Sequence, residues 1–463
     1  MRLGLARIAD FLGLPPPALD PVITGAAIDS RKAKPGDLFV CLPGERADGH
    51  DFALQAVQNG AAAVLAARAL PDVRAPVLIA PNPELALGRI AAFWRSLFGG
   101  RVAVITGTCG KTTCKQALAA ILAQTGEVAS TCGNLNNQLG LPLTILAASG
   151  LERFWVLEAG ISQPGDMEYL GEIARPDLAL ILNAGPGHEQ GLAGRGVAWH
   201  KAQLLRYLAP GGSAIINGDC QPLVEAARAL RSRLVFFGDC AGCAGSASQG
   251  AAPGAYSLTL AGRKVSVKTP MAGKTGADNA LAAALAAVEL GLSDRQIRDG
   301  LAAMRLAPRR GESCEVGRFH LIDASYNANP LSMAAMLTEA RQTADRLRRP
   351  LVCVLGEMLE LGASAQAEHV SLGRKLAASQ PTAIFWKGGW SDEIDAGLRA
   401  AGGAASLQPA GEPAAIAAAI CADPLFREQG AVILFQGSRA NRLEEYVDVL
   451  KNRLVAGETA DVL

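Results

Sequence analysis

Short apolar runs separated by longer mixed segments recur along this chain. Runs at 102–105, 155–158, 178–183 and 214–217 are rich in aliphatic residues and end at or just before a polar residue or glycine. Buried strands of a parallel sheet produce this pattern, and their carboxyl ends carry functional groups. An alanine-rich stretch at 280–290 fits a helix that Gly291 ends. The pattern predicts an α/β domain with a parallel sheet.

The same alternation begins earlier and continues later. Near the amino terminus, residues 38–42 and 62–65 predict strands, and 52–59 predict a helix stopped by Gly60. After residue 311, strand-like runs at 321–323, 351–356, 383–386 and 431–437 alternate with helical segments, which predicts a second, Rossmann-like doubly wound domain. A chain of 463 residues is long enough for three domains. We expect their bounds at 1–85, 86–306 and 307–463.

Two stretches are expected to lack regular structure. Residues 71–83 carry several prolines and read as a connection into the second domain. Residues 238–254 are poor in apolar side chains and predict a mobile loop. This loop contains Cys240 and Cys243, a single C-x-x-C pair with no second pair nearby, which favours a surface turn over a zinc or redox site.

Composition narrows the class of protein. Lys plus Arg is 44 and Asp plus Glu is 43, so the net charge of +1 gives no reason to expect nucleic acid or an anionic membrane as a partner. Charges interrupt every candidate for a membrane-spanning helix, and the first residues lack the core of a signal peptide, so we expect a cytoplasmic protein without membrane insertion. Ten scattered cysteines make reduced thiols the default.

The strongest chemical signal is the glycine-rich turn Gly-Thr-Cys-Gly-Lys-Thr-Thr at 107–113. It lies between an apolar strand and a predicted helix at 114–124, so backbone N–H groups and the helix amino terminus can converge on an anion. Lys111 would reach the outer phosphates of a nucleotide, and the Thr112 hydroxyl would ligate Mg2+. The spacing is one residue shorter than the common phosphate-loop motif, but the flanking elements favour a phosphate loop over a plain turn.

Three residues downstream of this loop are candidates for chemistry. Glu158 ends a strand and is placed to complete a Mg2+ site begun by Thr112, although a solvated carboxylate is the simpler alternative. His188 follows the next strand, and a crevice shared by several strand ends favours a ligand or catalytic role over a loop histidine bonded to backbone. Lys201 starts an amphipathic helix, where a lone lysine is normally solvated, so the residues alone assign it no role.

Two asparagine-rich loops also follow predicted strands. The first spans 133–140 and the second, Asp-Ala-Ser-Tyr-Asn-Ala-Asn-Pro, spans 323–330. Amides can both donate to and accept from a polar ligand, although asparagine also tolerates left-handed turns. The position of both loops suggests two faces of one site between domains.

Taken together, these residues resemble the Mur ligases, the ATP-dependent amide-bond-forming enzymes of peptidoglycan assembly. The resemblance runs essentially end to end, and its specific pieces are Asp29-Ser30-Arg31, 106–113, 133–142, Glu158, His188, Lys201, 323–330, His369 and Gly437-Ser438-Arg439. The Tyr-Asn-Ala-Asn-Pro run is the most specific of them. It resembles the family member that adds D-Ala-D-Ala to UDP-N-acetylmuramoyl-tripeptide.

The resemblance implies a division of labour among the domains. The first would hold the UDP-sugar, the second would bind ATP, and the third would bring the incoming amine. ATP would be bound by Gly107, Thr108, Gly110, Lys111, Thr112, Thr113, Asn279, Arg310 and Asp323. The other substrates would be bound by Ser30, Arg31, Asn134, Asn136, Asn137, Tyr326, Asn327, Asn329 and His369.

The resemblance also implies the catalytic set, which would be Lys111, Glu158, His188 and Lys201. One Mg2+ would lie on Thr112 and Glu158, and a second on His188 and a carbamylated Lys201. The peptide carboxylate would take the γ-phosphate of ATP to give an acyl phosphate, which the dipeptide amine would then attack. A monomer is expected.

The chain departs from the family pattern at five positions. The family usually shows Gly-x-His-Asn-x-x-Asn where this chain has Thr275 and Gly276 in place of the His and the first Asn. Gln203 and Gln436 stand where Glu and Lys are usual, and Arg309 stands where Gly is usual. These departures leave two alternative functions open. The chain could be a paralogue that joins a different acid and amine, or a nucleotide-binding regulator without catalysis. The complete metal-binding set argues against the regulator.

Overall fold

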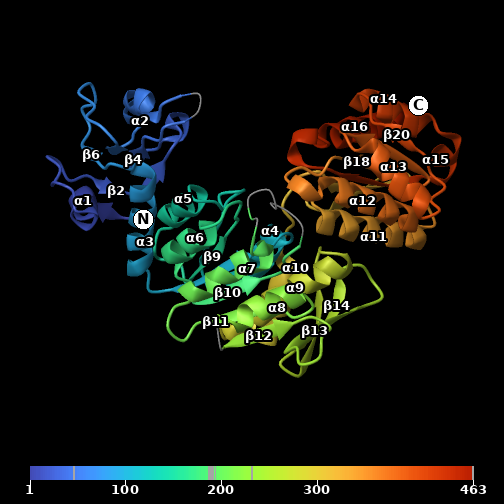
Figure 1. The fold of residues 1–463 in the computed structure, drawn as a ribbon, viewed down its shortest axis with the longest axis horizontal. Helices are drawn as coiled ribbons and strands as arrows, with labels where there is room; N and C mark the ends of the chain where they lie inside the picture. Colours follow the sequence, from blue (N-terminus) through green and yellow to red (C-terminus); the bar gives the residue numbers. More distant parts are fainter. Residues whose placement is uncertain (45–46, 186–191, 193, 231–232, 461–463) are drawn as a thin grey trace.

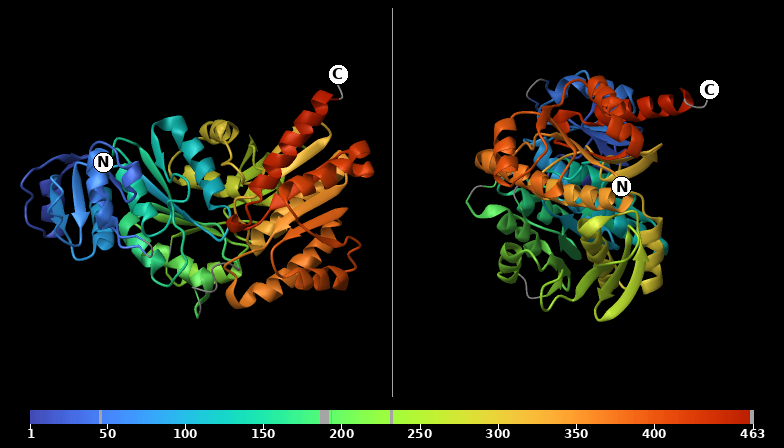
Figure 2. Two further views of the ribbon diagram at one scale, coloured as in Figure 1. Left: turned by 90° about the horizontal axis from the view of Figure 1, so that it is seen from above. Right: turned by 90° about the vertical axis from the view of Figure 1, so that its right-hand side faces the viewer.

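The computed structural model describes residues 1–44, 47–185, 192, 194–230 and 233–460. Three α/β units follow one another along the chain, and the central unit lies between the other two along the long axis of the molecule (Figures 1 and 2). The α/β prediction with a parallel central sheet and a Rossmann-like carboxyl-terminal unit is confirmed. Within the described part of the chain, no helix combines the length and apolar character needed to cross a bilayer.

The amino-terminal unit is built on a four-stranded parallel sheet. Its strands are β3 (Gly25–Ala27), β4 (Asp37–Val40), β5 (Ala63–Ala66) and β6 (Val77–Ile79), with helices α1 (Leu5–Leu12) and α2 (Ala53–Gln58) and a small antiparallel pair, β1 (Leu3–Gly4) and β2 (Val22–Ile23). Strand β6 lies inside the 71–83 stretch, so the expectation of a plain connection there is wrong. The prolines flank this edge strand and do not interrupt it, and an edge position tolerates them.

The central unit contains a nine-stranded sheet in the order β15-β14-β13-β12-β11-β10-β7-β9-β8. The strands are β7 (Arg101–Thr106), β8 (Val128–Ser130), β9 (Phe154–Glu158), β10 (Leu178–Ile181), β11 (Ser213–Asn217), β12 (Leu234–Phe237), β13 (Gly245–Gln249), β14 (Ala255–Leu260) and β15 (Arg263–Lys268). The helices are α3 (Pro83–Leu97), α4 (Lys111–Leu122), α5 (Gly140–Ala147), α6 (Asp166–Ala174), α7 (Gly196–Ala202), α8 (Gln221–Arg228), α9 (Gly273–Glu289) and α10 (Asp294–Ala303). Alternate residues of the buried strand β7 belong to two separate apolar cores, so helices cover both faces of the sheet.

Helix α3 connects the first two units. Its buried face, with Leu87 and Ile90, belongs to the same apolar core as Leu38 and Leu65 of the amino-terminal sheet and Leu157 of β9. The two units therefore share one continuous core across this helix. The bounds of the three domains stay a prediction.

The stretch 238–254 is not a mobile loop, so that expectation is wrong. Strand β13 lies within it and pairs antiparallel with β14. Its Ser-Ala-Ser-Gln sequence is poor in apolar residues because much of the strand is only partly buried. In the turn before β13, Cys240 and Cys243 form a disulfide, so the expectation of reduced thiols is wrong for this pair.

The carboxyl-terminal unit has a six-stranded sheet in the order β16-β17-β21-β18-β19-β20, with β16 antiparallel and the others parallel. Its strands are β16 (Glu312–Val316), β17 (Phe319–Ala324), β18 (Leu351–Gly356), β19 (Ala383–Lys387), β20 (Leu407–Pro409) and β21 (Ala431–Gln436). Helices α11 (Pro330–Leu347), α12 (Ala365–Ser379) and α13 (Ser391–Ala400) cover one face, and α14 (Pro413–Ala422), α15 (Pro424–Gln429) and α16 (Glu444–Ala460) cover the other (Figure 1). Helices on both faces make this unit doubly wound, as expected.

The backbone conformation of Arg309 explains why the family usually has glycine at this position. Its φ of 64° lies in the left-handed region, where glycine is unstrained and a side chain is not. The guanidinium lies 3.5 Å from Glu444 Oε1 and 3.7 Å from Asp448 Oδ2 on α16. These ion pairs help to hold a residue whose backbone favours glycine.

Because the strain comes from Cβ, we expect Arg309→Gly to be more stable than Arg309→Ala by about 1 kcal/mol. Both variants lose the same ion pairs with Glu444 and Asp448. The difference between their stabilities therefore measures the cost of a Cβ in the left-handed conformation. Thermal unfolding should show the glycine variant about 2–4 °C above the alanine variant. Equal midpoints would mean that the left-handed conformation at this position carries no cost.

Candidate functional site

The phosphate loop joins β7 to α4 at the carboxyl edge of the central sheet. Gly110 precedes α4 at φ 83°, in the left-handed conformation, and a Cβ placed there would lie 2.7 Å from Asn279 Oδ1. Glycine is therefore required at this turn by both backbone and packing. Lys111 Nζ donates to the Gly107 carbonyl at 2.7 Å, so its cation lies over the loop. Burial lowers the pKa of Lys111.

Asn183 shapes the first half of this loop, a role that the sequence did not suggest. Its Oδ1 accepts hydrogen bonds from the N–H groups of Thr108 and Cys109, both at 2.9 Å. Its Nδ2 donates to the Cys109 carbonyl at 3.1 Å. These two N–H groups are already bonded within the protein, so an anion would meet the free N–H groups in the first turn of α4.

Glu158 lies at the centre of the site and is only 1% exposed. The Thr112 hydroxyl donates to its Oε2 at 3.2 Å, and Asn136 Nδ2 approaches the same oxygen at 3.4 Å. Lys115 Nζ lies 3.1 Å from Oε1, but its direction of approach makes an ion pair without a hydrogen bond. Oε1 is thus a buried carboxylate oxygen that accepts no hydrogen bond.

This pair of groups fits a magnesium ion. Mg2+ prefers oxygen ligands, and here a hydroxyl and an ionisable carboxylate with one unbonded oxygen lie side by side. In the described ranges, no cluster of three or more His, Cys, Asp or Glu side chains could hold a metal. A metal at this place would therefore depend on Glu158, on hydroxyl groups and on ligands from outside the described residues.

Lys115 is a second residue of this site to which the sequence assigned no role. It is 5% exposed, and its Nζ also donates to the Thr131 carbonyl. The Thr131 hydroxyl in turn accepts from the N–H of Glu158 at 2.9 Å. A signal was present, because Lys115 falls on the same helical face as Leu118 and Leu122, which are both buried. A charged residue in an apolar stripe indicates a buried partner of opposite charge.

Lys201 does not lie where a lone lysine was expected. It belongs to the last turn of α7, not to the start of a helix, and only 2% of it is exposed. Its pKa is held well below the usual range, first by burial and then by the charge of Lys111, while Cys109 opposes the shift. Both of these charged or ionisable neighbours, Lys111 and Cys109, belong to the phosphate loop. His188 lies outside the described residues.

The carboxyl-terminal unit contributes to the same region. Asn329 caps α11 and its Nδ2 lies 3.4 Å from the carbonyl of Thr108 in the phosphate loop. The Arg310 guanidinium lies over the Tyr326 ring at 3.9 Å, and its charge contributes to the lowered pKa of Lys111. Asp323 is turned inward, since its Oδ1 accepts from the backbone N–H and hydroxyl of Ser325 at 3.0 and 2.6 Å.

Other predicted binding residues lie away from these contacts. Ser30 is buried and donates to Gln55 at 2.7 Å, while Arg31 is 80% exposed and pairs with Asp29 at 2.9 Å. His369 is fully buried, donates to the Ala365 carbonyl at 2.7 Å and stacks on Trp390 at 5.5 Å. Asn134, Asn137 and Asn327 are exposed, and Thr113 lies in the first turn of α4. Their predicted binding roles stay predictions.

The two glutamines that depart from the family pattern are both 1% exposed. Gln203 Nε2 donates to the Trp199 carbonyl at 3.0 Å, which ties it to the helix before it. Gln436 ends β21, and its Oε1 is buried without a hydrogen bond. Neutral side chains suit both positions, because a charge there would be buried.

A cavity of about 170 Å³ adjoins the phosphate loop. It is lined by Cys109, Leu182, Asn183, Asn217, Phe237, Thr275, Asp278, Asn279 and Leu331. Leu331 comes from the carboxyl-terminal unit and also fills the space beside Gly185, where a Cβ would lie 2.4 Å from its Cδ1. The cavity is therefore closed from two units.

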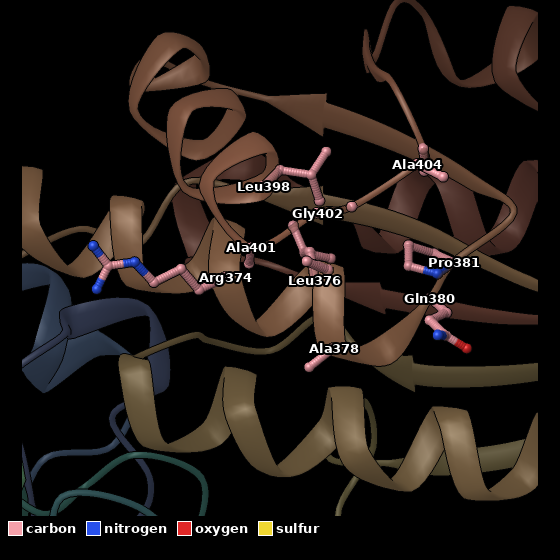
Figure 3. Close-up of a pocket in the computed structure, with 12 residues that line it drawn as sticks. Arg374, Leu376, Ala378, Gln380, Pro381, Leu398, Ala401, Gly402 and Ala404 are labelled. Atoms are coloured by element: carbon pink, nitrogen blue, oxygen red, sulfur yellow. The ribbon is translucent and has the colours of Figure 1, made fainter.

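A second cavity, of about 490 Å³, lies within the carboxyl-terminal unit at the ends of α12 and α13 (Figure 3). Small aliphatic residues and glycines make up most of its wall, and Arg374 is its one charged residue. The Arg374 guanidinium extends away from the other labelled residues (Figure 3). This cavity offers no set of groups for chemistry, so the candidate site is the one at the phosphate loop.

Comparison with known proteins follows the same three units. Residues 22–95 match the model described as "Mur ligase family, catalytic domain". Residues 105–287 match "Mur ligase middle domain", and residues 309–439 match "Mur ligase, glutamate ligase domain". The chain is 34% identical to the UDP-N-acetylmuramoyl-tripeptide–D-alanyl-D-alanine ligase of Escherichia coli, over 97% of this chain and 99% of that one. The enzyme of the same name from Bacillus subtilis is 32% identical over 94% of each chain.

Solved structures agree with the sequence relatives. A crystal structure of MurF from Acinetobacter baumannii superposes with a TM-score of 0.86 at 29% identity, covering 98% of this chain and 99% of that one. MurF ligase from Thermotoga maritima in complex with ADP superposes with a TM-score of 0.80 at 26% identity, covering 93% and 97%.

Proposed function

This chain belongs to the Mur ligase family, and from that premise we propose that it joins D-alanyl-D-alanine to UDP-N-acetylmuramoyl-tripeptide with hydrolysis of ATP. One observation carries the proposal. The phosphate loop, the buried carboxylate of Glu158 and Asn329 of the carboxyl-terminal unit meet at one edge of the central sheet. An enzyme that activates an acid with ATP and then passes it to an amine needs its nucleotide at such a junction between domains.

The reaction has two steps. The terminal carboxylate of the tripeptide attacks the γ-phosphorus of ATP, the bond to the β-phosphate breaks, and ADP leaves behind an acyl phosphate. The dipeptide amine then attacks the acyl carbon, phosphate leaves and the amine loses a proton. Lys111 and the first-turn N–H groups of α4 stabilise the charge that develops on the transferred phosphoryl group. Arg310, Asn279 and Asn329 orient the nucleotide from the other side of the loop.

Mg2+ would neutralise phosphate charge and orient the γ-phosphate when it is bound. Thr112 and Glu158 would hold one ion, and His188 with a carbamylated Lys201 would hold a second. The environment of Lys201 supports carbamylation, because burial and the charge of Lys111 lower the pKa of its amine and so favour the neutral form, which reacts with CO2. Carbamylation would replace a buried amine by an anionic oxygen ligand.

Replacement of Lys201 by either Ala or Arg is expected to lower ligation about 10²-fold. Neither side chain can carry a stable carbamate, so arginine should not rescue activity despite its charge. Phosphate release should be measured in CO2-depleted buffer with and without bicarbonate, with Lys264→Met on the exposed strand β15 as the matched control. Bicarbonate should activate the parent enzyme and the control alone. Unchanged ligation in Lys201→Ala, with no response to bicarbonate in the parent, would contradict this role.

The substrates are tested with a matrix of muramoyl peptides and dipeptides, in the presence of ATP and Mg2+. Phosphate release and product mass should both depend on UDP-N-acetylmuramoyl-tripeptide and D-Ala-D-Ala. Activity with another acid and amine only would identify a paralogue of the same chemistry. Sedimentation of the pure protein tests the expected monomer in the same preparation.

A further inference from the structure

One departure from the family pattern leaves nucleotide recognition to other residues. The family usually places His and Asn near the start of the helix that is α9 here, and this chain has Thr275 and Gly276. A Cβ on Gly276 would lie 3.0 Å from both Tyr256 Oη and the Met271 side chain. Tyr256 cannot easily retreat, since its hydroxyl donates to the carbonyls of Met271 and Gly273, both at 3.0 Å. This packing leaves little room for an asparagine side chain at position 276.

The cavity beside the phosphate loop is the place where the base of a bound nucleotide would lie. Cys109 of the phosphate loop forms part of its wall, and Asn279 lies both in its wall and against Gly110. A nucleotide with its phosphates at this loop extends into the adjoining cavity. Its volume of about 170 Å³ suits one planar ring system.

Among the described residues of this wall, Asp278 is the one charged group. Lys274 Nζ donates to Asp278 Oδ1 at 2.8 Å, and the same ammonium lies 3.0 Å from Asp239 Oδ2. The Asp278 side chain keeps 26% of its surface exposed. Lys274 thus holds Oδ1, and the carboxylate of Asp278, which lines the cavity, keeps the capacity to accept a further hydrogen bond there.

We propose that Asp278 selects the base of the nucleotide, with its carboxylate accepting a hydrogen bond from the exocyclic 6-amine of adenine. The chemistry of the ring edges favours adenine over guanine. Adenine carries an amine donor at ring position 6, which a carboxylate oxygen accepts, whereas guanine carries a carbonyl acceptor at that position, which the carboxylate would repel. The proposal rests on the proposed function only in that ATP is the nucleotide used.

The test compares ADP with purine riboside 5′-diphosphate, which lacks the 6-amine and is otherwise the same molecule. Calorimetric titration of the full chain should give about 10-fold tighter binding of ADP, because a charged acceptor loses its donor in the analogue. Asp278→Ala should reduce this preference to about twofold or less. Asp299→Asn, an exposed carboxylate on α10, is the matched control and should keep the full preference.

Two results would overturn the proposal. Retention of the parent's preference in Asp278→Ala would do so, and so would an equal loss of affinity for both ligands, which would make Asp278 a structural residue. Asp278→Leu keeps the approximate size of the side chain and removes its acceptors, so it serves as the second variant, with the same expected loss of preference, if thermal unfolding shows that the alanine variant is not folded. Because binding is measured without ligation, a preference for ADP in a protein that forms no amide would reject the proposed function and leave this inference standing.

Discussion

Replacement of Lys111 by methionine is expected to lower kcat/KM for ATP-dependent ligation by about 10²–10³-fold, equivalent to about 2.7–4 kcal/mol of transition-state stabilisation. Methionine keeps the length and apolar stem of the side chain and removes the cation. The ammonium group already lies over the phosphate loop, 2.7 Å from the Gly107 carbonyl, so it is organised before the nucleotide arrives. Preorganised charge at the site of phosphoryl transfer accounts for an effect of this size.

The measurement is steady-state phosphate release with ATP, Mg2+ and saturating acid and amine substrates. Lys264→Met on exposed strand β15 serves as the control for loss of one positive charge. KM values for the acid and the amine should change little, since Lys111 acts on the phosphates. Activity within twofold of the parent would mean that the γ-phosphate does not lie at this loop.

Lys115→Met should destabilise the protein by about 3–5 kcal/mol, the usual cost of removing one partner of a buried ion pair. Both partners are at least nine-tenths buried, so solvent screens their interaction weakly. The loss arises because the buried carboxylate of Glu158 would lose its ion-pair partner and keep only Thr112 and Asn136 as neighbouring donors.

A double-mutant cycle separates the pair from the packing. Lys115→Met combined with Glu158→Gln should recover much of the stability that Lys115→Met loses, because the uncompensated charge is gone. Urea unfolding of the three variants and the parent measures the coupling. If the two single changes add without recovery, the 3.1 Å contact contributes nothing beyond side-chain packing.

Local pattern was enough to locate most of the fold. The runs at 102–105, 178–183 and 431–437 became the buried strands β7, β10 and β21, since a fully buried parallel strand must be apolar on both faces. The phosphate loop was also visible, because glycine, lysine and threonine at fixed spacing are a local requirement of anion binding. The strands that were not predicted include β6, β8 and β13 to β16, which lie at or near the edges of their sheets and need less apolar sequence.

The candidate site was visible in part. Glu158 could be assigned a role from the sequence pattern, because it ends an apolar strand beside the phosphate loop. Lys201 was assigned a role only through the family resemblance. Lys115 and Asn183 were assigned no role, since each acts through a partner distant in sequence, and Asp278 was assigned none because the cavity that it lines forms only when two units pack together. No rule of spacing relates such partners.

The α/β class, the order of the units and the loop at 107–113 could be predicted from the amino-acid sequence, because strand burial and phosphate binding depend on neighbours along the chain. The surroundings of that loop became known from the folded arrangement. It buried Lys201 and Lys115, turned Asp323 inward and closed the cavity with Leu331 from another unit. The physical reason is that burial and charge pairing depend on which surfaces meet after folding, and that is a property of the whole packing.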